Sequence, residues 1–268
     1  MTANSTQMNT TPISASAADK PALATTNLSK SFGALAVTKD VSLSLPRGGR
    51  YALIGPNGAG KTTLINLMTG LLQPDSGQIY LGGEDITKVA SDTRVKRGLS
   101  RTFQINTLFP HLTPIESVTL AICERRGVAG VWWKGLPSYD DAADEAYGIL
   151  KSLGLDKVCY RATRELAYGQ QRLLEIALAL ASKPKVLLLD KPAAGVPREE
   201  STELFTVISG LSQDMTILFI EHDMNVVFRF AQRIIVLVGG AVLMEGTPQE
   251  ISSDPRVREV YLGKGHHV

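Results

Sequence analysis

The sequence is poor in cysteine, has no long apolar run and carries no strong excess of either charge. Its two cysteines, Cys123 and Cys159, lie in separate segments without metal-ligand spacing, so we expect reduced, packed thiols and neither a zinc nor a redox site. The longest apolar stretches, such as Val186–Leu189 and Ile234–Val238, are far shorter than the roughly 20 residues that a membrane-spanning helix requires. Any contact with a membrane is therefore expected to go through a partner protein.

The near-neutral charge argues against a nucleic-acid-binding protein, and the composition of the N-terminus argues against a secreted one. A formal net charge of +2 gives no basic face of the kind that binds nucleic acid, so no nucleic acid partner is expected. Residues 1–22 are rich in Ser, Thr, Ala and Asn and contain no aromatic residue, which predicts a disordered tail. They also lack the basic start and apolar core of a secretory signal, so we expect the chain to stay in the cytoplasm.

From residue 23 to about residue 264 the pattern predicts a single α/β domain, in which short β-rich segments alternate with amphipathic helical ones. Strands are expected at 41–45, 51–54, 78–81, 186–189, 216–220 and 234–238, and the last three are apolar enough for a parallel core sheet. Helices are expected at 61–68, 115–124, 140–153 and 170–182. No β signal lies between about 105 and 166, which predicts a helical insert, and 128–137, with Trp132 and Trp133, is expected to form a loop.

A phosphate-binding loop is predicted between the strand expected at 51–54 and the helix expected at 61–68. Its sequence is Gly55-Pro56-Asn57-Gly58-Ala59-Gly60-Lys61-Thr62-Thr63. Glycines let backbone N–H groups point inward and approach phosphate oxygens at a helix N-terminus, whose dipole favours anions. Lys61 adds a positive charge, and Thr62 offers a hydroxyl to Mg²⁺. The alternative is a structural glycine turn.

A carboxylate follows the apolar strand Val186–Leu189 at Asp190. It is delivered to the carboxyl edge of the sheet, where ligands of open α/β sheets bind, and it is a candidate to hold the Mg²⁺ that accompanies ATP. By itself it could equally be a helix cap or a turn residue, and the upstream phosphate loop favours the metal role.

The segment Leu166-Ala167-Tyr168-Gly169-Gln170-Gln171-Arg172 distinguishes among the folds that share these elements. It resembles the signature of ATP-binding-cassette (ABC) ATPases, in the variant typical of branched-chain amino acid importers. The resemblance covers about residues 24 to 263 and includes the tail from Asp254 to Gly263. It implies a P-loop NTPase fold with a mostly parallel core sheet, N-terminal antiparallel strands, an inserted helical subdomain at about 105–166 and a C-terminal helical tail at about 247–264.

The resemblance assigns roles to further residues. Ala167, Tyr168, Gly169 and Gln170 would contact ATP held by an opposite subunit, so that two chains enclose two ATP molecules. Gln104 is similar to the glutamine that joins the magnesium site to the helical insert, His222 to the switch histidine on the γ-phosphate, and Phe32 to the aromatic that stacks on adenine. Each has an ordinary structural alternative, because a strand-end histidine or an aromatic near the first strand is often part of the core.

The implied assembly contains a second ATPase subunit, identical or different, and two transmembrane permease subunits at the cytoplasmic face of the inner membrane. A periplasmic binding protein would deliver the substrate. ATP and Mg²⁺ are the implied cofactors, and branched-chain amino acids are the implied substrates. Amides, urea and other small polar solutes remain alternatives, because specificity in such systems belongs to the binding protein and the permease.

The sequence departs from the family pattern at three places. Lys191 stands where a glutamate acts as the general base, which predicts impaired hydrolysis at this chain's own site. Pro197 replaces a polar residue of the loop that couples the two sites, and Ala167 and Tyr168 replace the commoner Ser and Gly. Two other functions stay open: a nucleotide-binding regulator that does not hydrolyse ATP, and a soluble cassette ATPase that acts on nucleic acid or ribosomes.

Overall fold

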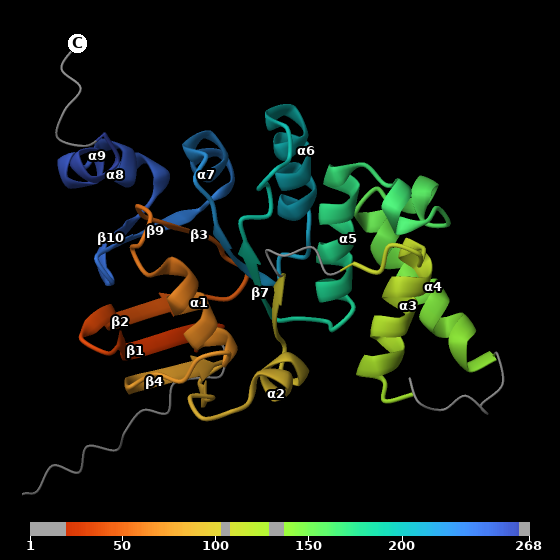
Figure 1. The fold of residues 1–268 in the computed structure, drawn as a ribbon, viewed down its shortest axis with the longest axis horizontal. Helices are drawn as coiled ribbons and strands as arrows, with labels where there is room; N and C mark the ends of the chain where they lie inside the picture. Colours follow the sequence, from red (N-terminus) through yellow and green to blue (C-terminus); the bar gives the residue numbers. More distant parts are fainter. Residues whose placement is uncertain (1–19, 103–107, 129–136, 263–268) are drawn as a thin grey trace, which may run out of the picture.

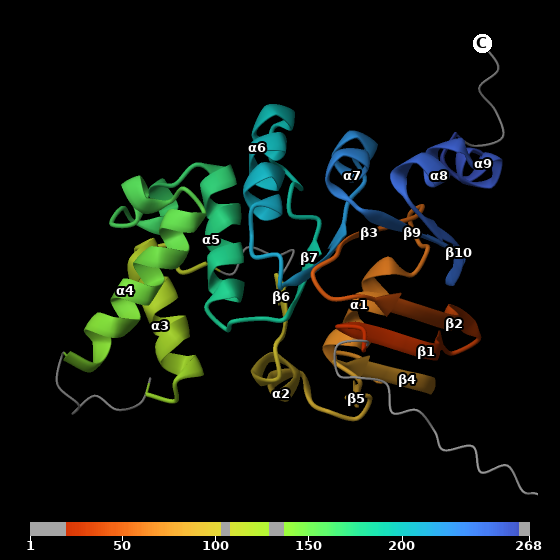
Figure 2. The same ribbon diagram turned by 180° about the vertical axis from the view of Figure 1, so that it is seen from behind.

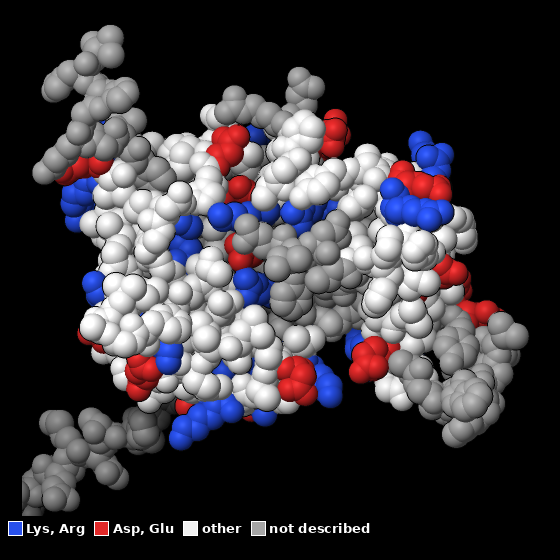
Figure 3. Space-filling model, viewed as in Figure 1, with Lys and Arg blue, Asp and Glu red and all other residues white. Residues whose placement is uncertain are grey.

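The computed structural model describes residues 20–102, 108–128 and 137–262. Two sheets enclose one helix, and a helical part lies to one side of them (Figures 1 and 2). Within these ranges no helix combines the length and the apolar content needed to cross a lipid bilayer. Charges of both signs are scattered over the face shown in Figure 3, between larger uncharged areas.

The larger sheet has six strands in the order β10-β9-β3-β8-β7-β6, parallel except for the β9–β10 pair. The strands β3, β7 and β8 lie in its middle and are buried along their whole length, as their continuous apolar sequences predict. The six strands are β3 (Arg50–Ile54), β6 (Leu99–Thr102), β7 (Val186–Asp190), β8 (Thr216–Ile220), β9 (Arg233–Val238) and β10 (Ala241–Gly246).

The smaller sheet is antiparallel, with the order β2-β1-β4-β5. Its strands are β1 (Leu23–Phe32), β2 (Leu35–Leu45), β4 (Ser76–Leu81) and β5 (Glu84–Asp85). β1 was not predicted, because register shifts interrupt its pairing with β2 and its sequence shows no clean alternation. Phe32 therefore ends a strand, whereas the sequence placed it before the first one. The expected fold class is correct: a mostly parallel core sheet with N-terminal antiparallel strands.

Helix α1 (Lys61–Thr69) fills the space between the two sheets. Its buried residues Leu64, Leu67 and Met68 join a core that includes one face of the larger sheet and the inner face of the smaller one. The opposite face of the larger sheet is covered by a second core, to which α5 (Tyr168–Leu180), α6 (Arg198–Ser209), α7 (Met224–Phe230), α8 (Pro248–Ser253) and α9 (Pro255–Leu262) contribute. The short helix α2 (Ser91–Lys96) precedes β6.

The fully buried side chain of Arg94, in α2, caps the C-terminal end of α1 with hydrogen bonds. Its guanidinium donates to the carbonyl oxygens of Leu67 and Met68 at 2.8 and 2.6 Å, and also to Thr87 and Val89 at 2.9 Å. A cation at a helix C-terminus satisfies free carbonyl groups and complements the helix dipole. The helix that begins in the phosphate loop is thus anchored at its other end.

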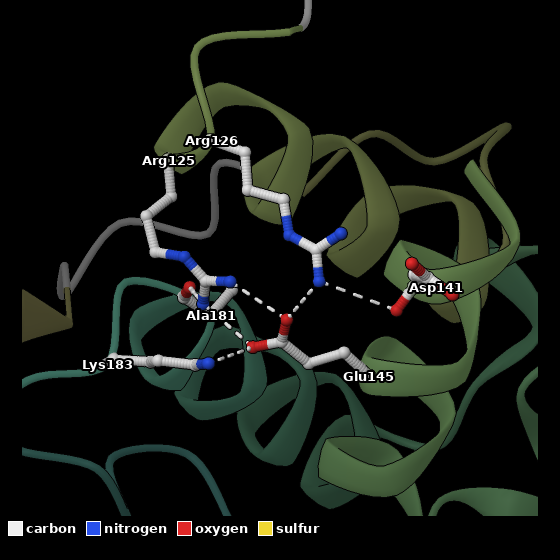
Figure 4. A network of polar contacts seen from close by, with 6 residues as sticks. All are labelled: Arg125, Arg126, Asp141, Glu145, Ala181 and Lys183. Atoms are coloured by element: carbon white, nitrogen blue, oxygen red, sulfur yellow. Dashed lines mark hydrogen bonds and ion pairs between the residues drawn. The ribbon is translucent and has the colours of Figure 1, made fainter. Parts of the chain in front are cut away.

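The helical part is formed by α3 (Pro114–Arg125), α4 (Pro137–Ser152) and two 3₁₀ turns, at Asp156–Val158 and Thr163–Glu165. Figure 4 shows the polar network that joins it to the end of α5. The Glu145 carboxylate accepts from Arg125 at 2.8 Å, Arg126 at 2.7 Å and Lys183 at 3.1 Å, and Arg125 also donates to the Ala181 carbonyl at 2.6 Å. Hydrogen bonds from Arg125, followed by those from Arg126 and Lys183, lower the pKa of Glu145 to about 2.

Candidate functional site

The loop between β3 and α1 forms a cradle that only glycine can build at two positions. A Cβ added to Gly55 would lie 2.1 Å from the Leu237 carbonyl oxygen, and one added to Gly60 would lie 2.5 Å from that of Val37. Gly58 and Gly60 also have φ angles of 78° and 97°. The loop then leads directly into the N-terminus of α1, whose first turn has no acidic residue. This geometry suits an anion such as a phosphate group.

The loop lines a cavity of 240 Å³ that brings together residues far apart in the sequence. Lys191, after β7, and His222, after β8, reach it from neighbouring parallel strands. The lining residues are Val37, Asn57, Gly58, Ala59, Gly60, Lys61, Thr62, Thr63, Lys191 and His222. Phe32 is not among them: the residue is 49% exposed, and the ammonium of Lys30 lies 5.8 Å from its ring centroid. Val37 was not predicted, because an apolar residue in a strand gives no site signal.

Lys61 is buried within the loop, where its ammonium donates to the carbonyl oxygens of Gly55 at 2.7 Å and Pro56 at 2.9 Å. Burial lowers its pKa, the positive charge of Lys191 lowers it further, and Asp190 acts in the opposite direction. Two carbonyl groups are weak partners for a buried cation. Exchanging them for phosphate oxygens would therefore be favourable.

Asp190 ends β7 with a side chain that is 1% exposed. One carboxylate oxygen, Oδ2, accepts from Arg101 Nη2 at 2.7 Å, and Arg101 Nη1 donates to Asn66 Oδ1 at 2.5 Å. The other oxygen, Oδ1, is buried and has no hydrogen-bond partner within the described ranges. An unpaired buried carboxylate oxygen, with the Thr62 hydroxyl in the first turn of α1, fits an oxygen-preferring cation such as Mg²⁺. Arg101 was not predicted, since its partner is 89 residues away.

The segment 191–196 follows β7 and begins with Lys191 at a φ of 52°. Its backbone is held by Glu221, whose carboxylate accepts from the N–H groups of Ala193 at 2.9 Å and His222 at 3.2 Å. Burial raises the pKa of Glu221. Both of its oxygens are thus engaged by backbone, and it acts as a support for this segment. Burial lowers the pKa of His222, and the charges of Lys61 and Lys191 lower it further, so the imidazole is neutral at neutral pH.

The signature residues lie at the start of α5 and do not line the cavity. The Gln170 side chain accepts from the Ala167 N–H at 3.1 Å, and a Cβ added to Gly169 would lie 2.9 Å from Glu200 Oε2. The Tyr168 hydroxyl donates to the Ala194 carbonyl at 3.1 Å. The first turn of α5 is therefore tied to the segment that carries Lys191. Gln104 lies outside the described residues.

Comparisons with known proteins agree with this arrangement. Residues 38–194, more than half of the chain, match the family model described as ABC transporter, and residues 241–267 match one described as branched-chain amino acid ATP-binding cassette transporter. The chain is 37% identical over 254 residues to the high-affinity branched-chain amino acid transport ATP-binding proteins BraF of Pseudomonas aeruginosa and LivG of Escherichia coli K12. Each alignment covers 91% of this chain and 99% of the relative.

Among solved structures, MJ1267, an ATP-binding cassette of an ABC transporter, superimposes with a TM-score of 0.81 at 32% identity. That alignment covers 91% of this chain and 99% of MJ1267. A dimeric structure of the bacterial ABC transporter cassette MJ0796 gives a TM-score of 0.70 at 26% identity, with 84% and 98% of the two chains covered. Sequence, fold and the phosphate-loop cavity lead to one conclusion: this chain belongs to the family of ABC transporter ATPases.

Proposed function

We propose that this chain is the ATP-binding and ATP-hydrolysing subunit of an importer for branched-chain amino acids, with impaired hydrolysis at its own site. The observation that carries the proposal is the cavity in which the glycine loop, Lys61, Lys191 and His222 meet. The substrate class is supported by the match of residues 241–267 and by the names of the relatives. It would work at the cytoplasmic face of the inner membrane, beneath two permease subunits served by a periplasmic binding protein.

Nucleotide binding follows from the geometry of the loop. Backbone N–H groups of the glycine loop and of the N-terminus of α1 would hold the phosphates, while the Lys61 ammonium would exchange the Gly55 and Pro56 carbonyl groups for phosphate oxygens. Asp190 and the Thr62 hydroxyl, together with Gln104, would hold Mg²⁺. When bound, this cation supplies charge neutralisation to the β- and γ-phosphates. Adenine would stack on Phe32, which is exposed at the end of β1.

Lys191 occupies the position at which the proton of the attacking water must be accepted. An ammonium has no lone pair for that proton, and a nearby triphosphate favours the charged form of lysine. Glu221 is a nearby alternative carboxylate, but both of its oxygens accept backbone N–H groups. His222 would hydrogen-bond the γ-phosphate and orient water, so slow hydrolysis remains at this site.

A second ATPase subunit completes the mechanism. The N–H groups at the start of α5, with Gly169 at their centre, do not reach this chain's own cavity and would bind the γ-phosphate on the opposite subunit. In a heterodimer, the site made of the partner's phosphate loop and this chain's Ala167–Gln170 segment would turn over at full rate. Transport would then depend on one competent site.

Uptake of labelled leucine, isoleucine and valine tests the substrate class. Cells that carry Lys61→Ala should lose this uptake and keep uptake of labelled urea and amides. Loss of urea or amide uptake alone would refute the assignment. Purification of the chain from native membranes should recover the permease subunits, whereas recovery of ribosomes or nucleic acid would favour a soluble cassette ATPase.

A regulatory subunit that binds ATP without hydrolysing it is the second candidate, and the observation that favours it is Lys191 in the cavity. The two functions predict different rates of ATP hydrolysis in the assembled complex. ATP hydrolysis that rises when the partner ATPase and the permeases are added supports the motor, and none in any assembly supports the regulator.

A further inference from the structure

A buried ion pair joins the two strands at the edge of the larger sheet. Arg101 in β6 donates to Asp190 at the end of β7 at 2.7 Å, and their side chains are 9% and 1% exposed. The strands are parallel neighbours, with Arg101 opposite Leu188. Asn66 in α1 accepts from the same guanidinium at 2.5 Å. Arg101 is therefore held between the carboxylate and the helix that follows the phosphate loop.

This pair engages one carboxylate oxygen of Asp190, Oδ2, and leaves Oδ1 without a hydrogen-bond partner among the described residues. Asp190 is not among the residues that line the 240 Å³ cavity at the glycine loop. Arg101, by contrast, lines a separate cavity of 310 Å³ between α2, β6 and α5. The guanidinium that pairs with Asp190 thus belongs to a residue of this second cavity, whereas Lys61 and Thr62 line the phosphate cavity.

We propose that Arg101 is a positioning residue that holds Asp190 as its counter-ion in the absence of Mg²⁺, so that Mg²⁺ has to compete with the guanidinium for this carboxylate. The inference rests on the assignment of Asp190 to magnesium in the proposed function. Leaving a buried carboxylate without a partner is costly, so Arg101 stabilises the metal-free protein. The guanidinium and a cation compete for the same carboxylate charge, so Arg101 also raises the Mg²⁺ concentration that nucleotide binding requires.

The test is a magnesium titration of a fluorescent, non-hydrolysable ATP analogue on the full chain, with thermal unfolding in EDTA as a second measurement. Arg101→Met should lower the half-saturating Mg²⁺ concentration on the order of 10-fold and lower the Tm of the metal-free protein by several degrees. The control is Arg97→Met, which removes an exposed cation paired with Glu84 and should change neither quantity.

A double-mutant cycle separates competition at Asp190 from a general effect of charge. Asp190→Asn should raise the Mg²⁺ requirement, and adding Arg101→Met to it should cause no further change. An unchanged or higher Mg²⁺ requirement in folded Arg101→Met would overturn the inference while leaving the metal assignment intact. An unchanged requirement in Asp190→Asn would remove the metal assignment and the inference together.

A second variant keeps the test decisive should Arg101→Met fail to fold. Asn66→Ala removes a second hydrogen-bond partner of the guanidinium and leaves the ion pair in place. It should shift the Mg²⁺ requirement in the same direction by a smaller factor, about 2-fold to 3-fold. No shift in this variant would overturn the inference.

Discussion

Replacing Lys191 by glutamate should raise hydrolysis at the site built on this chain's phosphate loop. A positioned general base contributes about 10²–10⁴ in rate, which corresponds to about 3–5 kcal/mol of activation free energy. The backbone can accept the change, because Lys191 already has a φ of 52° and glutamate meets the same restriction there. We therefore expect Lys191→Glu to increase kcat by a factor in that range, measured as phosphate release at saturating ATP, alone and with the partner subunit.

The substitution also changes charge, and a second variant isolates that effect. Lys191→Gln removes the ammonium without supplying a base, so its kcat should stay within a few-fold of the unmodified chain. In both variants the pKa of His222 should rise, because the positive charge of Lys191 contributes to lowering it. Histidine resonances followed by NMR across pH would report this rise. Equal kcat values for the unmodified chain and Lys191→Glu would refute the reasoning that the base is missing and limiting.

Three further predictions address binding, assembly and stability. Lys61→Ala should abolish detectable ATP binding in a fluorescent-nucleotide titration, since it removes the cation that the loop places for the phosphates, and retained tight binding would contradict the site. Sedimentation should show a monomer without nucleotide and a dimer with ATP·Mg. Gly169→Asp should reduce the dimerisation affinity at least 10-fold, because its charge repels the γ-phosphate. Absence of any response to nucleotide, even with the partner subunit, would count against the two-subunit ATP sandwich. Glu145→Gln should lower the free energy of unfolding by about 1 kcal/mol at pH 7. Because the pKa of Glu145 falls from 4.5 to about 2 on folding, this difference from the unmodified chain should persist above about pH 5 and shrink between about pH 4.5 and pH 2 in urea titrations.

The sequence predicted those parts of the site that depend on local backbone rules. Glycines at 55, 58 and 60 predict a cradle, because Gly55 and Gly60 lie too close to neighbouring carbonyl groups for a Cβ and Gly58 has a positive φ that favours glycine. The resemblance assigned Lys191 and His222 to the phosphate site, and both follow neighbouring parallel strands, whose carboxyl ends meet at one edge of the sheet. Their convergence on the loop in one cavity follows from the same geometry.

Contacts between residues that lie far apart in the sequence could not be predicted from it. Arg101 lies beside Asp190 only because β6, an unpredicted strand, pairs with β7. Glu221 could be taken for a substitute base until its two backbone hydrogen bonds were known. The strand β1 was missed because its polar residues and register shifts hide the alternation that marks a strand.

The network around Glu145 has a mechanical consequence. It fixes α3 and α4 to Ala181 and Lys183, just beyond the end of α5, so we expect the helical part and α5 to move together. Helix α5 is about 20 Å long for its 13 residues. A tilt of this helix by about 5° about its end at the network would therefore displace Gly169 by about 2 Å. Because the Tyr168 hydroxyl donates a hydrogen bond to the Ala194 carbonyl, the same tilt would also displace the segment that carries Lys191.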